Sequence, residues 1–380
     1  MTTEAGKGGM LKAAAVLFGA IIGAGIFGLP YVISKAGYPV GFFWMITLAG
    51  AVALTHVLFG EVVSVTPGEH RLVGYCHIYL GKWAKWVETV ASVLSTYGGA
   101  LAYLILGGLF ISQILRLLVP ISPMAGSSLL FLMGVWAIWR GTKFLAGVDF
   151  WLTLGEGLSF LLLSVYALTA FEPANLAVSG PWTEALQPYG VILFAYGGIS
   201  AVTEVRRLAG SRRDLRRGLA LGSLAASGLT ILFVTAVVGA LGSSTSVEAV
   251  AGLNAKFGGP IPLLGAIAGF LAVATSYVVF ASYLKNQFQY DFKWRSWLAG
   301  FAAVGVPFLL FLAGVKNFGK IIELVGGALV GVEGVLVSLL YLKARKVHPG
   351  KMLAVPTPLV YLLTAIYAGG AIYELVFRLF

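Results

Sequence analysis

The sequence predicts an all-α polytopic membrane protein with eleven transmembrane helices. Of its 380 residues, 59% are hydrophobic and only 11% are charged, whereas soluble proteins carry about 25% charged residues. Eleven apolar runs are long enough to cross a hydrocarbon layer of about 30 Å as helices. Two of these runs contain glycines near their centres, where each glycine disfavours an unbroken helix by about 1 kcal/mol.

The predicted spans follow one another through short connections. They are residues 11–35, 40–63, 86–118, 124–140, 148–170, 187–205, 218–241, 261–285, 296–314, 319–342 and 354–378. Residues 70–86 mix aromatic side chains with Arg and Lys, which is typical of a helix lying in the membrane interface. The loops 171–186 and 242–260 are rich in Ser, Gly and Pro. The chain is therefore expected to form a single transmembrane domain.

Loop charge predicts the orientation, because cytoplasmic loops of membrane proteins are enriched in Lys and Arg. With a cytoplasmic N-terminus, only six of the 26 basic residues fall outside: Lys35, Arg116, Lys256, Lys316, Lys320 and Arg378. We therefore expect a multi-pass protein of the cell membrane (the plasma or inner membrane), with its N-terminus in the cytoplasm and its C-terminus outside. Residues 206–217 carry six arginines, which anchor this topology or contact lipid headgroups or a gate.

The first span is interrupted by Gly19, Gly23, Gly25, Gly28 and Pro30. In lipid, unpaired backbone groups persist only where they line a cavity or another part of the protein. The N–H groups and positive dipole of a half-helix starting here would attract a carboxylate, and the carbonyls freed upstream would attract a cation or an ammonium group. Broken helices of this kind form the substrate and ion sites of secondary transporters.

A second interruption lies at residues 197–200, in the middle of the sixth span. Spans 1 and 6 each begin a set of five spans, over about 11–170 and about 187–342, and one extra helix follows at about 354–378. Matching breaks in two five-span halves indicate a 5+5 inverted-repeat transporter. The alternative is that these glycines serve only close helix packing.

Two motifs carry a resemblance to a known group of transporters. Gly23-Ala24-Gly25-Ile26-Phe27, followed by Leu29-Pro30, resembles the first-helix signature of the amino acid/polyamine/organocation superfamily. The sixth span, running into Arg206-Arg207-Leu208-Ala209-Gly210, resembles its amino acid/auxin permease branch, especially bacterial aromatic and hydroxy amino acid permeases. The resemblance implies the leucine-transporter fold and amino acid transport with Na⁺ or H⁺. Ile199-Ser200-Ala201 replaces the histidine or proline common in this branch, which leaves the substrate open.

The resemblance also implies a substrate site. The N–H groups of Ala24 and Gly25 would hold the carboxylate, and the carbonyls of Ile21, Ala195 and Tyr196 the α-ammonium. Further site residues implied at and around the two breaks are Ile26, Phe27, Tyr97, Tyr196, Ile199 and Tyr277. The alternative for each aromatic residue is packing or contact with lipid.

A sodium site is implied by the same fold. It would combine the carbonyls of Gly19 and Ile22 in span 1 with the Ala272 carbonyl and the hydroxyls of Thr275 and Ser276 in span 8. Hard cations take several oxygen ligands. Alternatively, the two hydroxyls bond carbonyls one turn back. Sodium-independent relatives often carry a lysine in span 5, and this span has none, which favours Na⁺.

Glu156 in span 5 and Glu333 in span 10 lie well inside the predicted hydrocarbon layer. Carboxylates at that depth are costly and are functional candidates by default, so both are proton-coupling candidates. Glu333 could instead pair with a cationic substrate, and either residue could have a purely structural role. Glu204, beside Arg206 and Arg207, could form an ion pair at an inner gate.

Together these features predict a secondary active symporter of a small neutral or aromatic amino acid, working by alternating access and coupled to Na⁺. The alternatives are proton coupling through Glu156 or Glu333, and exchange of cationic amino acids or polyamines. Four scattered histidines and the single Cys76 argue against an enzyme, a disulfide or a cysteine-based metal site. No cofactor is expected beyond a coupling ion. The expected partners are the substrate and the lipid bilayer, with no nucleic acid and no protein partner.

Overall fold

Helices occupy every range predicted to cross the membrane. The structure, a computed structural model, describes residues 4–116, 118–140, 143–258, 261–290 and 292–378, and their side chains except those of 4–8, 143–152, 261–262 and 290. The first two spans correspond to α1 (Glu4–Ile21) with α2 (Gly25–Ala36), and to α3 (Tyr38–Val65). The short α4 (Leu72–Leu80) follows where an interfacial helix was predicted.

The remaining helices follow in the predicted order. They are α5 (Lys82–Leu115), α6 (Pro123–Arg140), α7 (Lys143–Leu168), α8 (Gln187–Tyr196) with α9 (Val202–Leu208), α10 (Arg212–Leu241), α12 (Ile261–Tyr290), α13 (Ser296–Leu312), α14 (Phe318–Leu324) with α15 (Gly331–Val347), and α16 (Thr357–Tyr373). Seven helices of the described chain are long and apolar enough to cross a membrane, and the bent pair formed by α1 and α2 makes an eighth. Shorter apolar helices cover Thr153–Leu168 and Ser296–Leu312. The number of crossings therefore stays a prediction.

Several features were not predicted from the sequence. A π-helical segment, Val325–Val330, separates α14 from α15. The loop 242–260 contains α11 (Val250–Phe257), which forms because Val250 and Leu253 are both buried. The loop before α8 contains two short 3₁₀ turns, Pro173–Leu176 and Trp182–Glu184.

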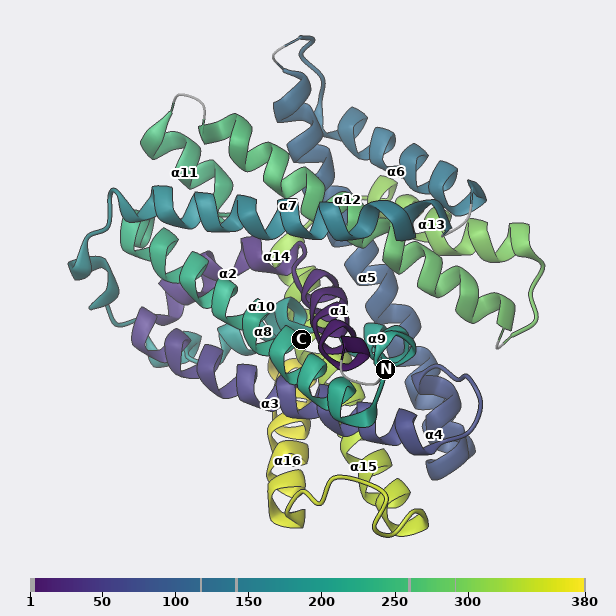
Figure 1. Ribbon diagram of the computed structural model, residues 1–380. Coiled ribbons are helices and arrows are strands. Elements are labelled where there is room, and N and C mark those ends of the chain that lie inside the picture. The colour runs from purple at the N-terminus through teal and green to yellow at the C-terminus, as the bar shows by residue number, and fades with distance from the viewer. Residues whose placement is uncertain (1–3, 117, 141–142, 259–260, 291, 379–380) are drawn as a thin grey trace.

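The helices pack as two groups. In the first, α1 and α2 pack with α3, α8, α9 and α10, and in the second α5 packs with α6, α12 and α13. Helix α7 contacts both groups, and the π-helical segment lies between α8 and α5. Figure 1 shows α1 near the centre of the view, with α6, α7, α12 and α13 gathered on one side of it. The broken segments α1–α2 and α8–α9 therefore lie inside the protein.

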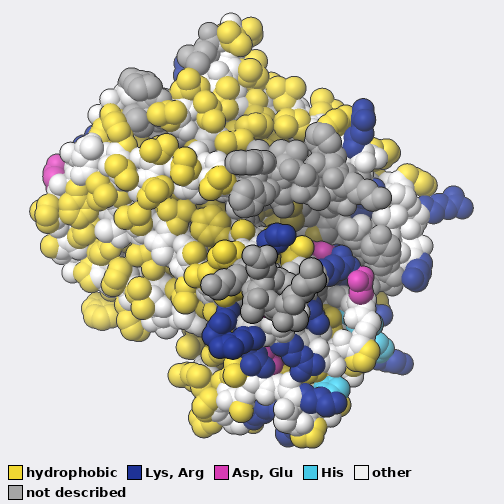
Figure 2. All heavy atoms as spheres, viewed as in Figure 1, with side chains coloured by type: hydrophobic (Ala, Val, Ile, Leu, Met, Phe, Trp, Pro, Cys, Tyr) yellow, Lys and Arg dark blue, Asp and Glu magenta, His cyan; other side chains and the backbone are white. Residues whose placement is uncertain are grey.

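The surface divides into an apolar region and a charged end. Hydrophobic side chains cover the left and upper parts of Figure 2, whereas Lys and Arg gather around α4, α9 and the connection between α15 and α16. Large apolar side chains such as Phe43 and Leu162 are each 61% exposed. A broad exposed apolar surface marks contact with lipid or another protein, and it fits the predicted transmembrane domain.

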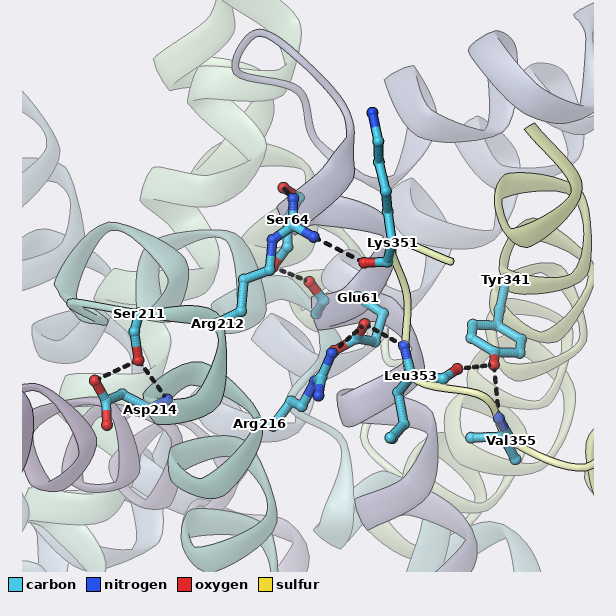
Figure 3. Close-up of polar contacts among 11 residues, drawn as sticks. Glu61, Ser64, Ser211, Arg212, Asp214, Arg216, Tyr341, Lys351, Leu353 and Val355 are labelled. Carbon is cyan, nitrogen blue, oxygen red and sulfur yellow. Dashed lines mark hydrogen bonds and ion pairs between the residues drawn. The ribbon is translucent and has the colours of Figure 1, made fainter. Parts of the chain in front are cut away.

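Ion pairs and hydrogen bonds hold the charged end together (Figure 3). Glu61 at the end of α3 is buried and receives hydrogen bonds from Arg216 of α10 and from the Leu353 N–H, the latter at 2.8 Å. Arg212 donates to the carbonyls of Lys351 (2.7 Å) and Ser64 (3.1 Å). The ends of α3, α10 and α15, all predicted to be cytoplasmic, thus lie at the same end of the molecule.

The loops predicted to lie outside also meet one another. Gly37 pairs with Ser179 in an isolated bridge. The Trp44 indole donates to the Ala185 carbonyl at 2.9 Å, and Arg378 pairs with Glu323. The charge-based prediction of which loops share a side is therefore consistent with the contacts, while the membrane side that each end faces stays a prediction.

Candidate functional site

The first span breaks where its glycines predicted. Helix α1 ends at Ile21, α2 begins at Gly25, and the axis bends by 62° between them. The N–H groups of Gly23 and Ala24 donate no hydrogen bond to the described chain, and the Ile22 carbonyl accepts none. All residues from Ile21 to Pro30 are buried. The break therefore presents unpaired donors and an unpaired acceptor inside the protein.

The sixth span is also interrupted, but it lacks the sharp bend of the first, and Trp182–Leu208 still counts as one candidate span. Helix α8 ends at Tyr196, and Gly197 adopts an extended conformation with ψ 131° before a short 3₁₀ turn begins at Ile199. The Gly198 N–H and the Gly197 carbonyl have no hydrogen-bond partner in the part of the chain that the structure describes. Both predicted interruptions are therefore present.

The two breaks contact each other. A Cβ atom on Gly25 would lie 2.6 Å from the Cα atom of Ala195, and one on Gly198 would lie 2.9 Å from Cγ1 of Ile21. Such distances are below normal carbon contacts of about 3.5–4.0 Å, so glycine permits this approach. The free backbone groups of both spans are thus brought to one place.

A cavity of about 80 Å³ lies against the breaks and extends toward the charged end. Four predicted residues line it: Ile21, Gly25, Ile199 and Glu333. Its lining also includes Glu88 and Tyr103 of α5, Phe280 and Tyr283 of α12, and Ser200, none of which was predicted as a site residue. These α5 and α12 residues come from the second helix group, so the cavity lies between the two groups.

Several predicted pocket residues lie elsewhere. Phe27 packs in an aromatic cluster, with its ring centroid 5.1 Å from those of Phe110 and Phe160. The Tyr277 ring lies against Gly134 of α6, where a Cβ atom would approach it to 2.4 Å. Ile26, Tyr97 and Tyr196 are not among the residues that line the cavity. Their contact with substrate stays a prediction that would require a different conformation.

One residue of the predicted sodium site, Ser276, lies beside the first break. A Cβ atom on Gly23 would lie 3.1 Å from both the Ser276 hydroxyl of α12 and the Tyr103 hydroxyl of α5. Thr275 instead bonds one turn back, to the carbonyls of Leu271 (2.9 Å) and Ala272 (3.2 Å). The Ser276 hydroxyl therefore lies at the first break, and the sodium site that would combine it with Gly19, Ile22, Ala272 and Thr275 stays a prediction.

The two predicted carboxylates differ in their position relative to the cavity. Glu156 of α7 is buried and does not line the cavity. Glu333 of α15 does line it, together with Glu88 of α5, which is 1% exposed. Glu88 was missed because hydropathy placed it at the edge of the third span, whereas α5 begins at Lys82 and buries it.

The comparisons with known proteins agree with this architecture. A sequence model described as the tryptophan/tyrosine permease family matches residues 7–376. The chain belongs to the tryptophan/tyrosine permease family. The search of curated proteins returned no significant match. Membership of this family makes the chain a membrane transporter and not an enzyme.

Two solved structures share the fold of this permease. One is MhsT in complex with L-phenylalanine, with a TM-score of 0.60 and 17% identity over 94% of this chain and 98% of that chain. The other is a manganese transporter from Eremococcus coleocola in complex with an aromatic bis-isothiourea compound, with a TM-score of 0.71 and 9% identity over 98% of this chain and 88% of that chain. These similarities show the leucine-transporter fold that the motifs implied.

An ion-pair network stands beside the cavity of the permease. Arg71, before α4, pairs with Glu204 of α9 at 2.8 Å and lies over the ring of Tyr283, a lining residue, at 5.7 Å. Glu204 also pairs with Arg207, which pairs with Glu69. The predicted Glu204–Arg207 pair is therefore present. Its partner Arg71 was missed because it is far away in the sequence.

Proposed function

We propose that this permease is a secondary active symporter of an aromatic or small neutral amino acid, which it binds between its two helix breaks. The observation that carries this proposal is the contact between the breaks, with the Gly23 and Ala24 N–H groups and the Ile22 and Gly197 carbonyls left unpaired. Unpaired N–H groups at the start of α2 suit the carboxylate of an amino acid. Carbonyls freed at the two breaks suit its ammonium group, the predicted ones being those of Ile21, Ala195 and Tyr196.

An aromatic side chain is the favoured substrate group. The family description names tryptophan and tyrosine, and the similar MhsT structure contains L-phenylalanine. A cavity of about 80 Å³ holds only a handful of water molecules. An aromatic amino acid therefore requires the two helix groups to separate, with Phe27, Tyr196 and the other predicted aromatic residues becoming available as the pocket widens.

The transport cycle follows from the two helix groups. We propose eleven crossings, two inverted repeats at about 11–170 and 187–342, and an extra helix at about 354–378. The charged end would face the cytoplasm, which places the N-terminus inside and the C-terminus outside. The cavity lies on that side of the breaks, whereas the aromatic cluster around Phe27 closes the other side. Rocking one group against the other would expose the site alternately.

Coupling to Na⁺ is the first proposal for the driving ion. The Gly19, Ile22 and Ala272 carbonyls with the Thr275 and Ser276 hydroxyls would supply its oxygen ligands. The free Ile22 carbonyl and the position of Ser276 beside Gly23 support this site.

Proton coupling is the second candidate, because Glu333 lines the cavity. Glu156 does not line the cavity, so a proton from the cavity could reach it only through neighbouring groups. Exchange of a cationic amino acid or polyamine is a further alternative, with Glu333 as the partner of the extra charge.

Uptake by the purified permease in lipid vesicles tests these proposals. Radiolabelled L-tryptophan, L-tyrosine and L-phenylalanine would be supplied under separate Na⁺ and pH gradients, with unlabelled L-lysine and spermidine as competitors. We expect uptake of at least one aromatic amino acid, driven by the Na⁺ gradient. Uptake driven by the pH gradient alone would identify H⁺, and not Na⁺, as the coupling ion. Competition by L-lysine or spermidine alone would instead favour the cationic exchanger, and binding of none of these compounds would contradict the proposed substrate site.

A further inference from the structure

Two acidic side chains from different helices share the cavity. Glu88 of α5 and Glu333 of α15 both line it, and the two helices pack against each other. Glu88 is 1% exposed, and its Oε2 atom is buried without a hydrogen-bond partner. A buried carboxylate oxygen that lacks a donor is costly. The site therefore lacks a positive or hydrogen-donating group.

The polar neighbours of this pair offer acceptors and few free donors. The Ser92 and Thr96 hydroxyls, which also line the cavity, donate to backbone carbonyls at 3.3 and 2.7 Å. Gln287 of α12 donates its amide to the Ser92 hydroxyl at 3.0 Å, and its Oε1 atom is buried without a partner. The unsatisfied side-chain atoms on this side of the cavity are thus oxygens that accept hydrogen bonds.

The other titratable groups that face the pair are neutral or engaged elsewhere. Cys76 of α4 is buried close enough for both carboxylate charges to act on it, and burial, followed by these charges, raises the pKa of its thiol. Tyr283 of α12 lies under the Arg71 guanidinium, and the positive charge of Arg71 is already paired with Glu204. Tyr103 also lines the cavity, and its hydroxyl lies beside Gly23 at the first break. Among these groups, none supplies a positive charge directly to the two carboxylates.

We propose that Glu88 and Glu333 form a carboxyl–carboxylate pair that binds one exchangeable proton in the cavity. Two neighbouring carboxylates inside a protein repel each other, and one shared proton removes this repulsion. The proton also gives the pair its missing hydrogen bond, whereas a metal ion would need several further oxygen ligands. On release, the proton passes to cavity water and two carboxylates remain.

The position of the pair connects this proton to movement. Glu88 belongs to the second helix group, and Glu333 follows the π-helical segment that packs on α8. When the groups separate, water would enter between the two carboxylates and take up the proton. This coupling rests on the proposed transport function, but the existence of the protonated pair does not.

Infrared spectroscopy of the permease in lipid vesicles tests the pair without transport. The stretching band of protonated carboxyl groups would be followed from pH 5 to pH 9 in the wild type, Glu88→Gln, Glu333→Gln and the control Glu172→Gln. Glu172 is exposed in a loop, with its side chain 66% exposed. We expect a component that disappears on alkalinisation and that is missing from both pair variants but present in the control.

An unchanged band in both pair variants would overturn the proposal. Glutamine keeps the shape of glutamate without its charge, and either variant alone suffices if the other does not fold. Glutamine at either position removes the shared proton.

Binding of L-tryptophan provides the second readout. If the proton is taken up with the substrate, the affinity for L-tryptophan falls by up to about tenfold per pH unit once the pH is high enough for the pair to lose its proton. We expect this dependence in the wild type and a change of less than about twofold in Glu88→Gln. A pH dependence that persists in both variants would contradict coupling through the pair. Absence of L-tryptophan binding at every pH would count against the proposed substrate, while the infrared result would still decide the pair.

Discussion

Gly25 allows no side chain at the first break. A Cβ atom there would lie 2.6 Å from the Ala195 Cα atom and 2.9 Å from Cδ1 of Phe194. The first of these atoms belongs to the backbone, so it cannot rotate away. A larger residue would therefore separate the two breaks and displace the donors and acceptors that the proposed site needs.

We predict that Gly25→Leu lowers the affinity for L-tryptophan by at least about 100-fold, which corresponds to about 2.7 kcal/mol of binding free energy. Expression should stay near that of the wild type, because a membrane helix tolerates leucine. Equilibrium binding of radiolabelled L-tryptophan measures the effect. Gly50→Leu is the matched control, since a Cβ atom on Gly50 meets nothing within 4 Å. Equal affinity in both variants would rule out Gly25 as part of the site.

Thr275 tests the sodium proposal at a single hydroxyl. Its hydroxyl hydrogen points to carbonyls one turn back, which leaves its oxygen able to bind a cation. Thr275→Ala should raise the Na⁺ concentration needed for half-maximal uptake about tenfold and change substrate affinity at saturating Na⁺ less than twofold. Thr230→Ala is the control, because Thr230 of α10 makes a similar bond, to the Ala226 carbonyl at 2.9 Å. Equal effects of the two variants would remove the hydroxyl from the sodium site.

Individual residues show which parts of the site were predictable. Gly23 and Gly25 mark the break because glycine in mid-span has a known backbone consequence, and Glu333 was found because a carboxylate deep in an apolar run is unusual. Tyr103 gives no comparable signal, since tyrosines in membrane helices usually pack. Glu88 and Arg71 depend on partners far along the chain, and one sequence does not show such pairs.

At the scale of elements, the π-helical segment at Val325–Val330 packs closely against α8. A Cβ atom on Gly326 would lie 1.8 Å from the Gly190 carbonyl oxygen and 2.6 Å from the Phe194 nitrogen. The widened turn therefore brings two glycines together just before the second break. The sequence predicted the span but not this irregularity, because a π-helical turn keeps the same apolar composition as an α-helix.

We predict that Gly326→Ala destabilises the permease by about 1–3 kcal/mol, the usual range for an overpacked site. The backbone atoms of α8 would have to move, so L-tryptophan binding should weaken as well. The melting temperature of the purified protein measures the first effect. Gly369→Ala of α16 is the control, because a Cβ atom on Gly369 meets nothing within 4 Å, and this variant should melt at or slightly above the wild-type temperature. A stable Gly326→Ala protein would contradict the close contact.

At the scale of the whole molecule, Glu61 joins three segments at the charged end. It accepts from Arg216 of α10 and from the Leu353 N–H beyond α15, and its side chain is 2% exposed. Glu61→Gln should lower the free energy of unfolding by about 1.5–3 kcal/mol, the range for hydrogen bonds to charged groups. Thermal melting measures this change. Glu172→Gln removes an exposed pair with Lys256 at 3.8 Å and should cost less than about 1 kcal/mol.

The fold as a whole was more predictable than its contacts. Apolar runs located the helices, because the hydrocarbon layer fixes their length, and loop charge grouped the connections that meet at each end. Hydropathy does not show which helices pack together, so the division into two packed groups comes from the structure. The size of the cavity depends on how these groups lie relative to one another, which residue spacing does not determine.

The most direct test of the central claim is a structure of the permease determined with L-tryptophan bound. We predict that the substrate carboxylate lies within hydrogen-bond distance of the Ala24 and Gly25 N–H groups. The ammonium group should meet the carbonyls of Ile21, Ala195 and Tyr196. L-Tryptophan bound away from both breaks, or two continuous helices in place of α1–α2 and α8–α9, would contradict the account.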